Sequence, residues 1–293
     1  MTKPVIGFIG LGLMGSNMVE NLQNHGFEMV VMSRKQGTLD AVIARGNARS
    51  VNTPKELAQA SDIVMLCVTT SEVVESLVYG EDCILAGIKE GAVLIDFGTS
   101  IPASTRKICA DLVSKSAGMI DAPLGRTPAH AKDGLLNIMA AGDEATFSKV
   151  KPVLDKQGEN VFYLGALGAG HVTKLINNFM GMTTVSAMSQ AFAVAERAGI
   201  NGGQLFDIMA AGPSNSPFMA FSKKYAVDGI SDLGFSINNA NKDLGYFLEM
   251  AKDMGTRSEI AEGTSNNLQA AVDAGFGEGN VPEIFDYFKD LEQ

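Results

Sequence analysis

The chain has 293 residues, 46% of them hydrophobic, so it is long enough for two domains with a substantial core. Its net charge of −10 argues against nucleic acid or an anionic membrane as a partner. No apolar run approaches the roughly 20 residues that a membrane-spanning helix needs. Three widely spaced cysteines and three histidines without ligand spacing predict reduced, buried thiols and no metal site. With a strand so near the N-terminus and no signal peptide expected, these features predict a cytoplasmic protein.

A glycine-rich turn follows an apolar strand at the start of the chain. Residues 5–9 form a short apolar run, and residues 14–22 carry apolar side chains at helical spacing. The glycines between them have the spacing Gly-x-Gly-x-x-Gly, which permits a tight turn, the approach of a pyrophosphate and close strand–helix packing. This placement predicts a dinucleotide-binding turn, and the alternative is a turn that binds nothing. The predicted cofactor contacts here are Gly10, Leu11, Gly12, Leu13, Met14 and Gly15.

The end of the second predicted strand indicates which dinucleotide is bound. Residues 28–32 are predicted to form this strand, and Ser33, Arg34 and Lys35 follow it. A carboxylate at this place accepts from the 2′-hydroxyl of NAD, whereas an arginine accommodates the 2′-phosphate of NADP. The segment has two cations and no carboxylate, so we expect NADP to be preferred, with NAD possible. The alternative is a pair of solvated surface charges.

Strands and helices alternate through the rest of the first half. This alternation predicts an α/β fold with an N-terminal doubly wound, Rossmann-type parallel sheet. The ends of two strands supply Cys67, Val68 and Thr99 as further candidate cofactor contacts. The predicted strands are residues 62–68, 91–96, 119–123, 135–141 and 161–164, and the predicted helices are residues 39–45, a short segment after Thr53, 71–79, 102–116 and 144–155.

The second half changes character after a small-residue hinge at residues 165–170. A long helix is predicted over residues 171–197, with Gly181 as its one strong interruption. No convincing strand recurs after it. We therefore expect a Rossmann domain over residues 1–164 and an all-α C-terminal domain over residues 165–293. The further predicted helices are residues 204–210, 218–227, 237–253, 258–274 and 281–291.

Two polar residues near the start of the long helix are candidates for chemistry. Lys174 and Asn178 are four residues apart and so share one helical face. The hinge before them places this turn beside the edge of the sheet where ligands bind. Lys174 could act there as a general acid, with Asn178 orienting it or binding a substrate hydroxyl. The alternative is a lysine on a solvated helix face.

A second group of residues could hold an anion. Gly125, Arg126 and Thr127 follow a predicted strand end, and the arginine offers a fork that matches a carboxylate or sulfonate. Lys242 could add a second cation and is also a candidate cofactor contact, and Asp243 could pair with it or complete the substrate network. A surface arginine without a ligand is the alternative for Arg126.

In these motifs the chain resembles the β-hydroxyacid dehydrogenases over nearly its full length. The resemblance implies that Lys174 is the catalytic acid/base and that Asn178 and Lys242 line the substrate site. It also implies a homodimer or homotetramer formed through the helical domain. The motifs that carry it are residues 7–15, Asp121-Ala122-Pro123, Gly168-Ala169-Gly170 followed by residues 174–178, and Lys242-Asp243-Leu244.

The chain departs from the family pattern at two places, and the first of these leaves the substrate open. Leu124-Gly125-Arg126-Thr127 stands where the family usually has Val-Ser-Gly-Gly, and it resembles the sulfolactaldehyde reductases, which favour NAD. Ser33-Arg34-Lys35 instead resembles the NADP-using glyoxylate and succinic semialdehyde reductases. Gly98-Thr99 replaces the Ser-Thr of many relatives, and Thr99 remains to contact the ligand.

The expected reaction is hydride transfer between NADP(H) and a small anionic aldehyde or its hydroxy acid, with Lys174 as general acid/base. The aldehyde is of the semialdehyde or sulfolactaldehyde type, and Arg126 with Lys242 holds its anionic group. Alternatives within the family are 3-hydroxyisobutyrate, tartronate semialdehyde, succinic semialdehyde and glyoxylate. Two alternatives belong to other classes: a non-catalytic NADP-binding regulatory protein and an imine reductase. Relatives of both kinds lack the helix lysine, so Lys174 argues against them.

Overall fold

The computed structural model describes residues 3–290 of the chain. The chain divides into two compact units on either side of the bond between Lys174 and Leu175. The first unit contains the sheet and the second is helical, so each is described by itself.

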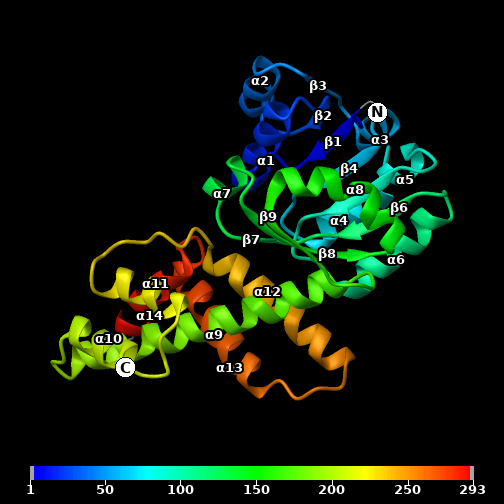
Figure 1. Ribbon diagram of the computed structural model, residues 1–293. Helices are drawn as coiled ribbons and strands as arrows, with labels where there is room; N and C mark the ends of the chain where they lie inside the picture. Colours follow the sequence, from blue (N-terminus) through cyan, green and yellow to red (C-terminus); the bar gives the residue numbers. More distant parts are fainter. Residues whose placement is uncertain (1–2, 291–293) are drawn as a thin grey trace. The chain divides into compact units, whose positions relative to one another are not determined.

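The described residues of the first unit form a nine-stranded sheet with the strand order β3-β2-β1-β4-β5-β6-β8-β7, in which β9 pairs with β8 (Figure 1). The strands from β3 to β6 pair in parallel, whereas β8 is antiparallel to both β6 and β7. The bounds are β1 (Ile6–Ile9), β2 (Met29–Met32), β3 (Ala48–Ser50), β4 (Ile63–Leu66), β5 (Val93–Asp96), β6 (Gly118–Asp121), β7 (Leu124–Gly125), β8 (Leu136–Gly142) and β9 (Gly158–Tyr163).

The parallel strands end at the same level. Ile9 is in register with Met32 on one side and with Leu66 on the other, and Leu66, Asp96 and Asp121 continue the row. The loops after these strands therefore share one edge of the sheet, which we call the carboxyl edge. Strand β1 lies between β2 and β4, so the sheet extends from β1 to β2 and β3 on one side and to β4 and β5 on the other. Open α/β sheets bind ligands at such a switch point in strand order.

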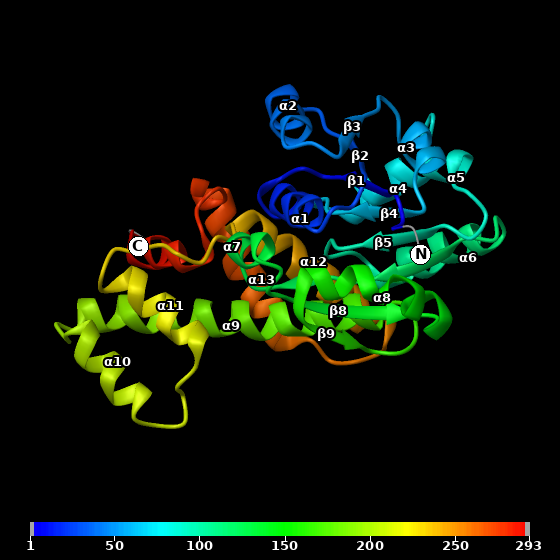
Figure 2. The same ribbon diagram turned by 45° about the horizontal axis from the view of Figure 1, so that its top comes forward.

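Helices pack against both faces of the sheet, which makes it doubly wound (Figure 2). Phe8 and Ile95 face the side covered by α1, α2 and α8, whereas Ile9 and Leu94 face the side covered by α3, α4, α5 and α6. The bounds are α1 (Leu13–Asn24), α2 (Gln36–Ala44), α3 (Pro54–Ala60), α4 (Ser71–Tyr79), α5 (Ile84–Gly87), α6 (Pro102–Val113), α7 (Pro128–Lys132) and α8 (Glu144–Gln157).

The second unit is built around the long helix α9 (Ala169–Arg197), which begins in the first unit. Gly181 is tolerated within α9 because Phe218 of α11 packs where a side chain would stand. Among residues 175–290 no strand forms beyond an isolated antiparallel bridge between Ser236 and Asn280. The further elements are α10 (Gly202–Ala210), α11 (Pro217–Ala226), α12 (Ile237–Asp253), α13 (Glu259–Ala271), the π-helical turn η1 (Val272–Phe276), the 3₁₀ turn η2 (Val281–Glu283) and α14 (Ile284–Asp290).

The structure confirms the predicted fold class but corrects several details. The sheet is not parallel throughout, because β8 runs against β6. Four short elements were not predicted, because they carry too few residues to show a periodic pattern: β3, α5, β7 and α7. The predicted helix over residues 258–274 ends at Ala271, and Gly275 with φ +93° breaks the turn that follows. Leu291, the last residue of the predicted final helix, lies outside the described residues.

The three cysteines are free thiols and are half-buried rather than fully buried. Among the helices of residues 3–290, none combines the length and the apolar character that crossing a bilayer requires.

Candidate active site

The three glycines of the first turn have different structural roles. Gly10 has φ +104°, and a Cβ atom there would overlap the carbonyl oxygen of Cys67. A Cβ atom at Gly15 would overlap the carbonyl oxygen of Gly10. A Cβ atom at Gly12 would meet no other atom within 4 Å. The fold therefore requires Gly10 and Gly15, whereas the open space at Gly12 fits the approach of a ligand to the backbone.

Helix α1 begins at this turn without a side-chain cap. Gly12 is the N-cap, so no side chain caps the helix, and the first turn contains no acidic residue. The side chain of Leu13 is exposed, whereas Leu11 is buried in the core and Met14 is half-buried against it. Unsatisfied N–H groups at a helix start bind phosphate. The residues present thus fit the pyrophosphate of a dinucleotide.

The segment after β2 exposes two cations. Arg34 and Lys35 are exposed, and Lys35 is the N-cap of α2. The Oγ of Ser33 accepts a hydrogen bond from the backbone N–H of Lys35 at 3.1 Å, which holds the segment in a turn. The three residues follow the strand next to β1, so they lie at the carboxyl edge beside the glycine turn.

The ends of β4 and β5 bring the other predicted cofactor contacts to the same edge. Burial raises the pKa of the Cys67 thiol to about 12, with Asp96 adding to the effect, so this cysteine stays a neutral thiol at physiological pH. Asp96 accepts hydrogen bonds from the backbone N–H of Gly98 at 2.8 Å and from the Oγ of Ser100 at 2.7 Å. These bonds shape the loop that carries the half-buried Thr99. Val68 follows β4 and is half-buried.

Lys174 is half-buried in the first turns of α9. The carboxylate of Asp121, at the end of β6, accepts from the backbone N–H groups of Gly168 and His171 at 2.8 Å each. Burial raises the pKa of Asp121, and the neighbouring His171 and these two donors oppose that rise. The start of α9 is therefore bonded to the carboxyl edge of the sheet.

No role was predicted from the sequence for Asp96, Thr105 or His171, which are buried near Asp121. The signal that could have found them is an aspartate at the end of each of two neighbouring strands. An ionisable side chain buried there needs a partner.

The three predicted substrate residues of the Gly-Arg-Thr segment are placed around β7. Arg126 adopts the left-handed backbone conformation with φ +77°, which costs a non-glycine residue about 1 kcal/mol. Its guanidinium donates to the carbonyl oxygen of Leu135 at 2.7 Å and forms an ion pair with Glu159 of β9. Gly125 is half-buried within β7. The Oγ1 of Thr127 is bonded to the Nδ1 of His130 at 2.7 Å.

The predicted residues of the second unit form one connected polar network. The Nδ2 of Asn178 on α9 donates to the Oδ2 of Asp243 on α12 at 2.6 Å. The Nζ of Lys242 lies 2.7 Å from the Oδ1 of Asp243 and 4.8 Å from the centre of the Tyr246 ring. Asn178 and Asp243 are buried, so one carboxylate orients both an amide and an amine.

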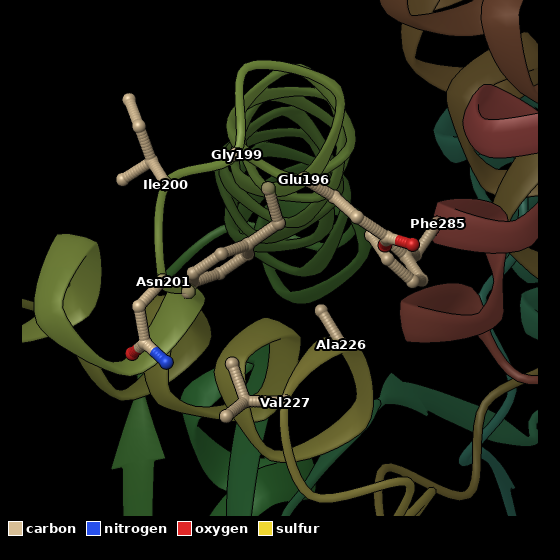
Figure 3. Close-up of a pocket in the computed structure, with 9 residues that line it drawn as sticks. Glu196, Gly199, Ile200, Asn201, Ala226, Val227 and Phe285 are labelled. Carbon is tan, nitrogen blue, oxygen red and sulfur yellow. The ribbon is translucent and has the colours of Figure 1, made fainter.

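A hollow of about 420 Å³ lies elsewhere in the second unit, where α9 ends (Figure 3). Its walls are polar and apolar in nearly equal parts and come from the end of α9, the segment that leads into α10, the end of α11 and α14. It contains none of the residues that the sequence predicts for binding or catalysis. Its lining residues are Phe192, Glu196, Gly199, Ile200, Asn201, Gly202, Ala226, Val227 and Phe285.

The open space at Gly12 gives a test that separates binding from folding. Gly12→Ala should fold normally, because the new methyl group meets no protein atom and the backbone conformation suits alanine. It should raise the Kd for NADPH about tenfold, because the methyl group stands where the pyrophosphate approaches. Thermal unfolding and fluorescence titration with NADPH measure the two effects. An unchanged Kd would show that no ligand approaches the backbone at Gly12.

Two family models match the chain. Residues 5–165 match the NAD binding domain of 6-phosphogluconate dehydrogenase. Residues 168–287 match the model described as NAD-binding of NADP-dependent 3-hydroxyisobutyrate dehydrogenase.

Relatives of known name match along most of their length. The chain is 30% identical to 2-(hydroxymethyl)glutarate dehydrogenase of Eubacterium barkeri, over 85% of this chain and 82% of that protein. It is also 30% identical to 2-hydroxy-3-oxopropionate reductase of Escherichia coli, over 84% of each protein. The solved structure of a 3-hydroxyisobutyrate dehydrogenase from Salmonella typhimurium is similar with a TM-score of 0.86 and 25% identity, over 97% of this chain and all of that one. The chain therefore belongs to the β-hydroxyacid dehydrogenase family and is an NAD(P)-dependent oxidoreductase.

Proposed function

We propose that this protein is an NADP-preferring reductase of a short aldehyde that carries an anionic group, and that Lys174 is its acid/base catalyst. The observation that carries the proposal is the start of α9 at the carboxyl edge of the nucleotide-binding sheet. Asp121 binds this helix start, and Lys174 follows within the next turn. Bound NADPH supplies hydride to the aldehyde carbon, and NADP⁺ accepts it in the reverse direction.

Lys174 donates a proton to the aldehyde oxygen as negative charge develops there, and in oxidation its neutral amine accepts the proton of the hydroxyl. Asn178, one turn further along α9, is the proposed hydrogen-bond partner of the substrate. Its amide is already oriented by Asp243, which also pairs with Lys242. A donor that is held in place loses little conformational freedom on binding, which favours catalysis.

The preference for NADP is proposed from the segment after β2. Arg34 and Lys35 are exposed at the start of α2, and Ser33 supplies a hydroxyl rather than a carboxylate. A 2′-phosphate carries negative charge, which two cations and a helix start favour. The cofactor contacts at Cys67, Val68 and Thr99 remain proposals at the neighbouring strand ends.

The anionic group of the substrate is proposed to bind Arg126, with Gly125 and Thr127 beside it. The guanidinium pairs with the carboxylate of Glu159, the kind of group that the substrate is proposed to carry. A substrate anion would take the place of Glu159. This pair is partly exposed, so displacing it costs little, since exposed ion pairs contribute about 0–1 kcal/mol.

A homo-oligomer formed through the second unit is also proposed. Large apolar side chains stand exposed on its helices, among them Val194 of α9, Ile208 of α10 and Ile260 of α13. A contact between two copies of the second unit would remove such side chains from water.

The central test is the Lys174→Ala variant. Loss of the positioned acid should lower kcat about 10²–10⁴-fold, while NADPH still binds, because the proposed cofactor contacts are elsewhere. Turnover is measured with a panel of succinic semialdehyde, glyoxylate, tartronate semialdehyde and sulfolactaldehyde. Lys151→Ala, which removes an exposed lysine of α8, is the control and should leave kcat unchanged. Parental turnover by Lys174→Ala would reject the proposed mechanism.

Cofactor choice is tested at Arg34. Arg34→Ala should lower kcat/KM for NADPH about 10- to 100-fold, the scale of a lost hydrogen bond to a charged group, and leave that for NADH nearly unchanged. Arg257→Ala removes a highly exposed arginine of the second unit and serves as the charge control. Steady-state rates with each cofactor give the ratio of kcat/KM for NADPH to kcat/KM for NADH. If parent and variant show the same ratio, Arg34 does not read the 2′-phosphate.

The role of Arg126 is tested with charged and neutral substrates. Arg126→Ala should raise KM for the anionic aldehydes of the panel about tenfold, because a charge-assisted bond is lost, and leave KM for propionaldehyde unchanged. Arg45→Ala, in the same unit, is the control, since Arg45 pairs with Glu20. An equal rise in KM for the neutral aldehyde would assign Arg126 to folding rather than to anion binding.

A further inference from the structure

Four polar side chains are buried together at the carboxyl edge of the first unit. Asp96 ends β5, Asp121 ends β6, Thr105 lies on α6 and His171 lies in the first turn of α9. Each is at most 1% exposed. Burying two carboxyl groups and an imidazole is costly unless they are paired, so this arrangement needs a reason beyond filling space.

The contacts of Asp121 show what the cluster holds. Its two carboxylate oxygens accept separately from the N–H groups of Gly168 and His171, at 2.8 Å each. Negative charge at a helix start is favourable, so these bonds fix the first turn of α9. Gly170 allows the close approach, because a Cβ atom there would stand 2.7 Å from the Oδ2 of Asp121.

His171 connects this helix start to a second loop. Its Nδ1 is bonded to the Oγ1 of Thr105 at 2.9 Å, and its Nε2 lies 3.6 Å from the Oδ2 of Asp96. The same Asp96 accepts from the N–H of Gly98 and the Oγ of Ser100. The loop with Thr99 and the helix with Lys174 therefore share one set of buried contacts.

We propose that Asp121 is a positioning residue for Lys174, and that His171, held by Thr105 and Asp96, completes its support. The proposal rests on the catalytic role proposed for Lys174. Lys174 follows His171 by three residues, so a shift at the helix start displaces its amine. A misplacement of about 1 Å can lower a rate about 100-fold, so fixing the helix start matters for the chemical step.

The test compares two carboxylates that each bind a helix start. Asp121→Asn removes the charge and turns one acceptor into a donor that faces an N–H group. Asp143→Asn is the matched control, because Asp143 accepts from the N–H and Oγ1 of Thr146 at 2.9 and 3.0 Å at the start of α8. Helix α8 carries no predicted site residue. Both variants are made in the full-length chain and assayed with the panel aldehyde that the parent reduces fastest.

Asp121→Asn should lower kcat about 10- to 100-fold and leave the Kd for NADPH within about twofold of the parent, whereas Asp143→Asn should leave kcat unchanged. Amide hydrogen exchange, which is independent of turnover, should become faster at residues 168–174 in Asp121→Asn and stay unchanged in α6. Thr105→Val, which removes the bond to the imidazole and a 3.3 Å bond to the carbonyl oxygen of Ile101 within α6, should lower kcat in the same direction by a smaller factor. If Asp121→Asn does not fold, Thr105→Val provides the test in its place.

Parental kcat in Asp121→Asn, measured while Lys174→Ala is inactive, overturns this inference and leaves the proposed function standing. Parental kcat in Thr105→Val removes His171 from the support and overturns that part. A fall in kcat accompanied by an equal weakening of NADPH binding assigns Asp121 to general folding and also overturns it. If Lys174→Ala itself keeps parental turnover, the proposed function fails first.

Discussion

The parallel pairing from β2 to β6 is the constraint on which the first unit depends. Because Ile9 is level with Met32 and Leu66, and Leu66 with Asp96, segments far apart in sequence meet at one edge. A slip of one residue in any strand would turn its buried side chains to the other face of the sheet. The apolar clusters on the two faces therefore determine this register. The glycine turn, the cationic segment and the Thr99 loop are positioned by this backbone pairing.

Polar groups at this edge divide into two kinds. Asp96, Asp121 and His171 are buried: Asp121 accepts from the backbone N–H of His171, and the Nε2 of the His171 ring lies 3.6 Å from Asp96. Arg34 and the open backbone at Gly12 instead face space that the protein leaves free. In the second unit, Asn178 and Lys242 likewise contact a buried carboxylate, that of Asp243. Buried hydrogen bonds thus hold the start of α9 and the side chain of Asn178, whereas Gly12 and Arg34 stay accessible to a cofactor.

Predictions from sequence succeeded where the signal was local. The turn at residues 10–15 was recognisable because a strand, three spaced glycines and a helix follow one another directly. The prediction did not reach the ion pair between Arg126 and Glu159, or the burial of His171 between two aspartates. These contacts join residues 33 to 75 positions apart, and no pattern in the chain indicates which distant side chains will meet.

The sequence by itself determined the alternation of strands and helices, the dinucleotide-binding turn, the change to an all-helical second half and the family. Each of these follows from hydrophobic periodicity or from motifs a few residues long. Tertiary structure alone decided that β8 runs antiparallel to β6, that Asp121 binds the start of α9 and that Asp243 orients both Asn178 and Lys242. These features depend on strand order and on the packing of helices. Those arise only when the whole chain has buried its apolar surface.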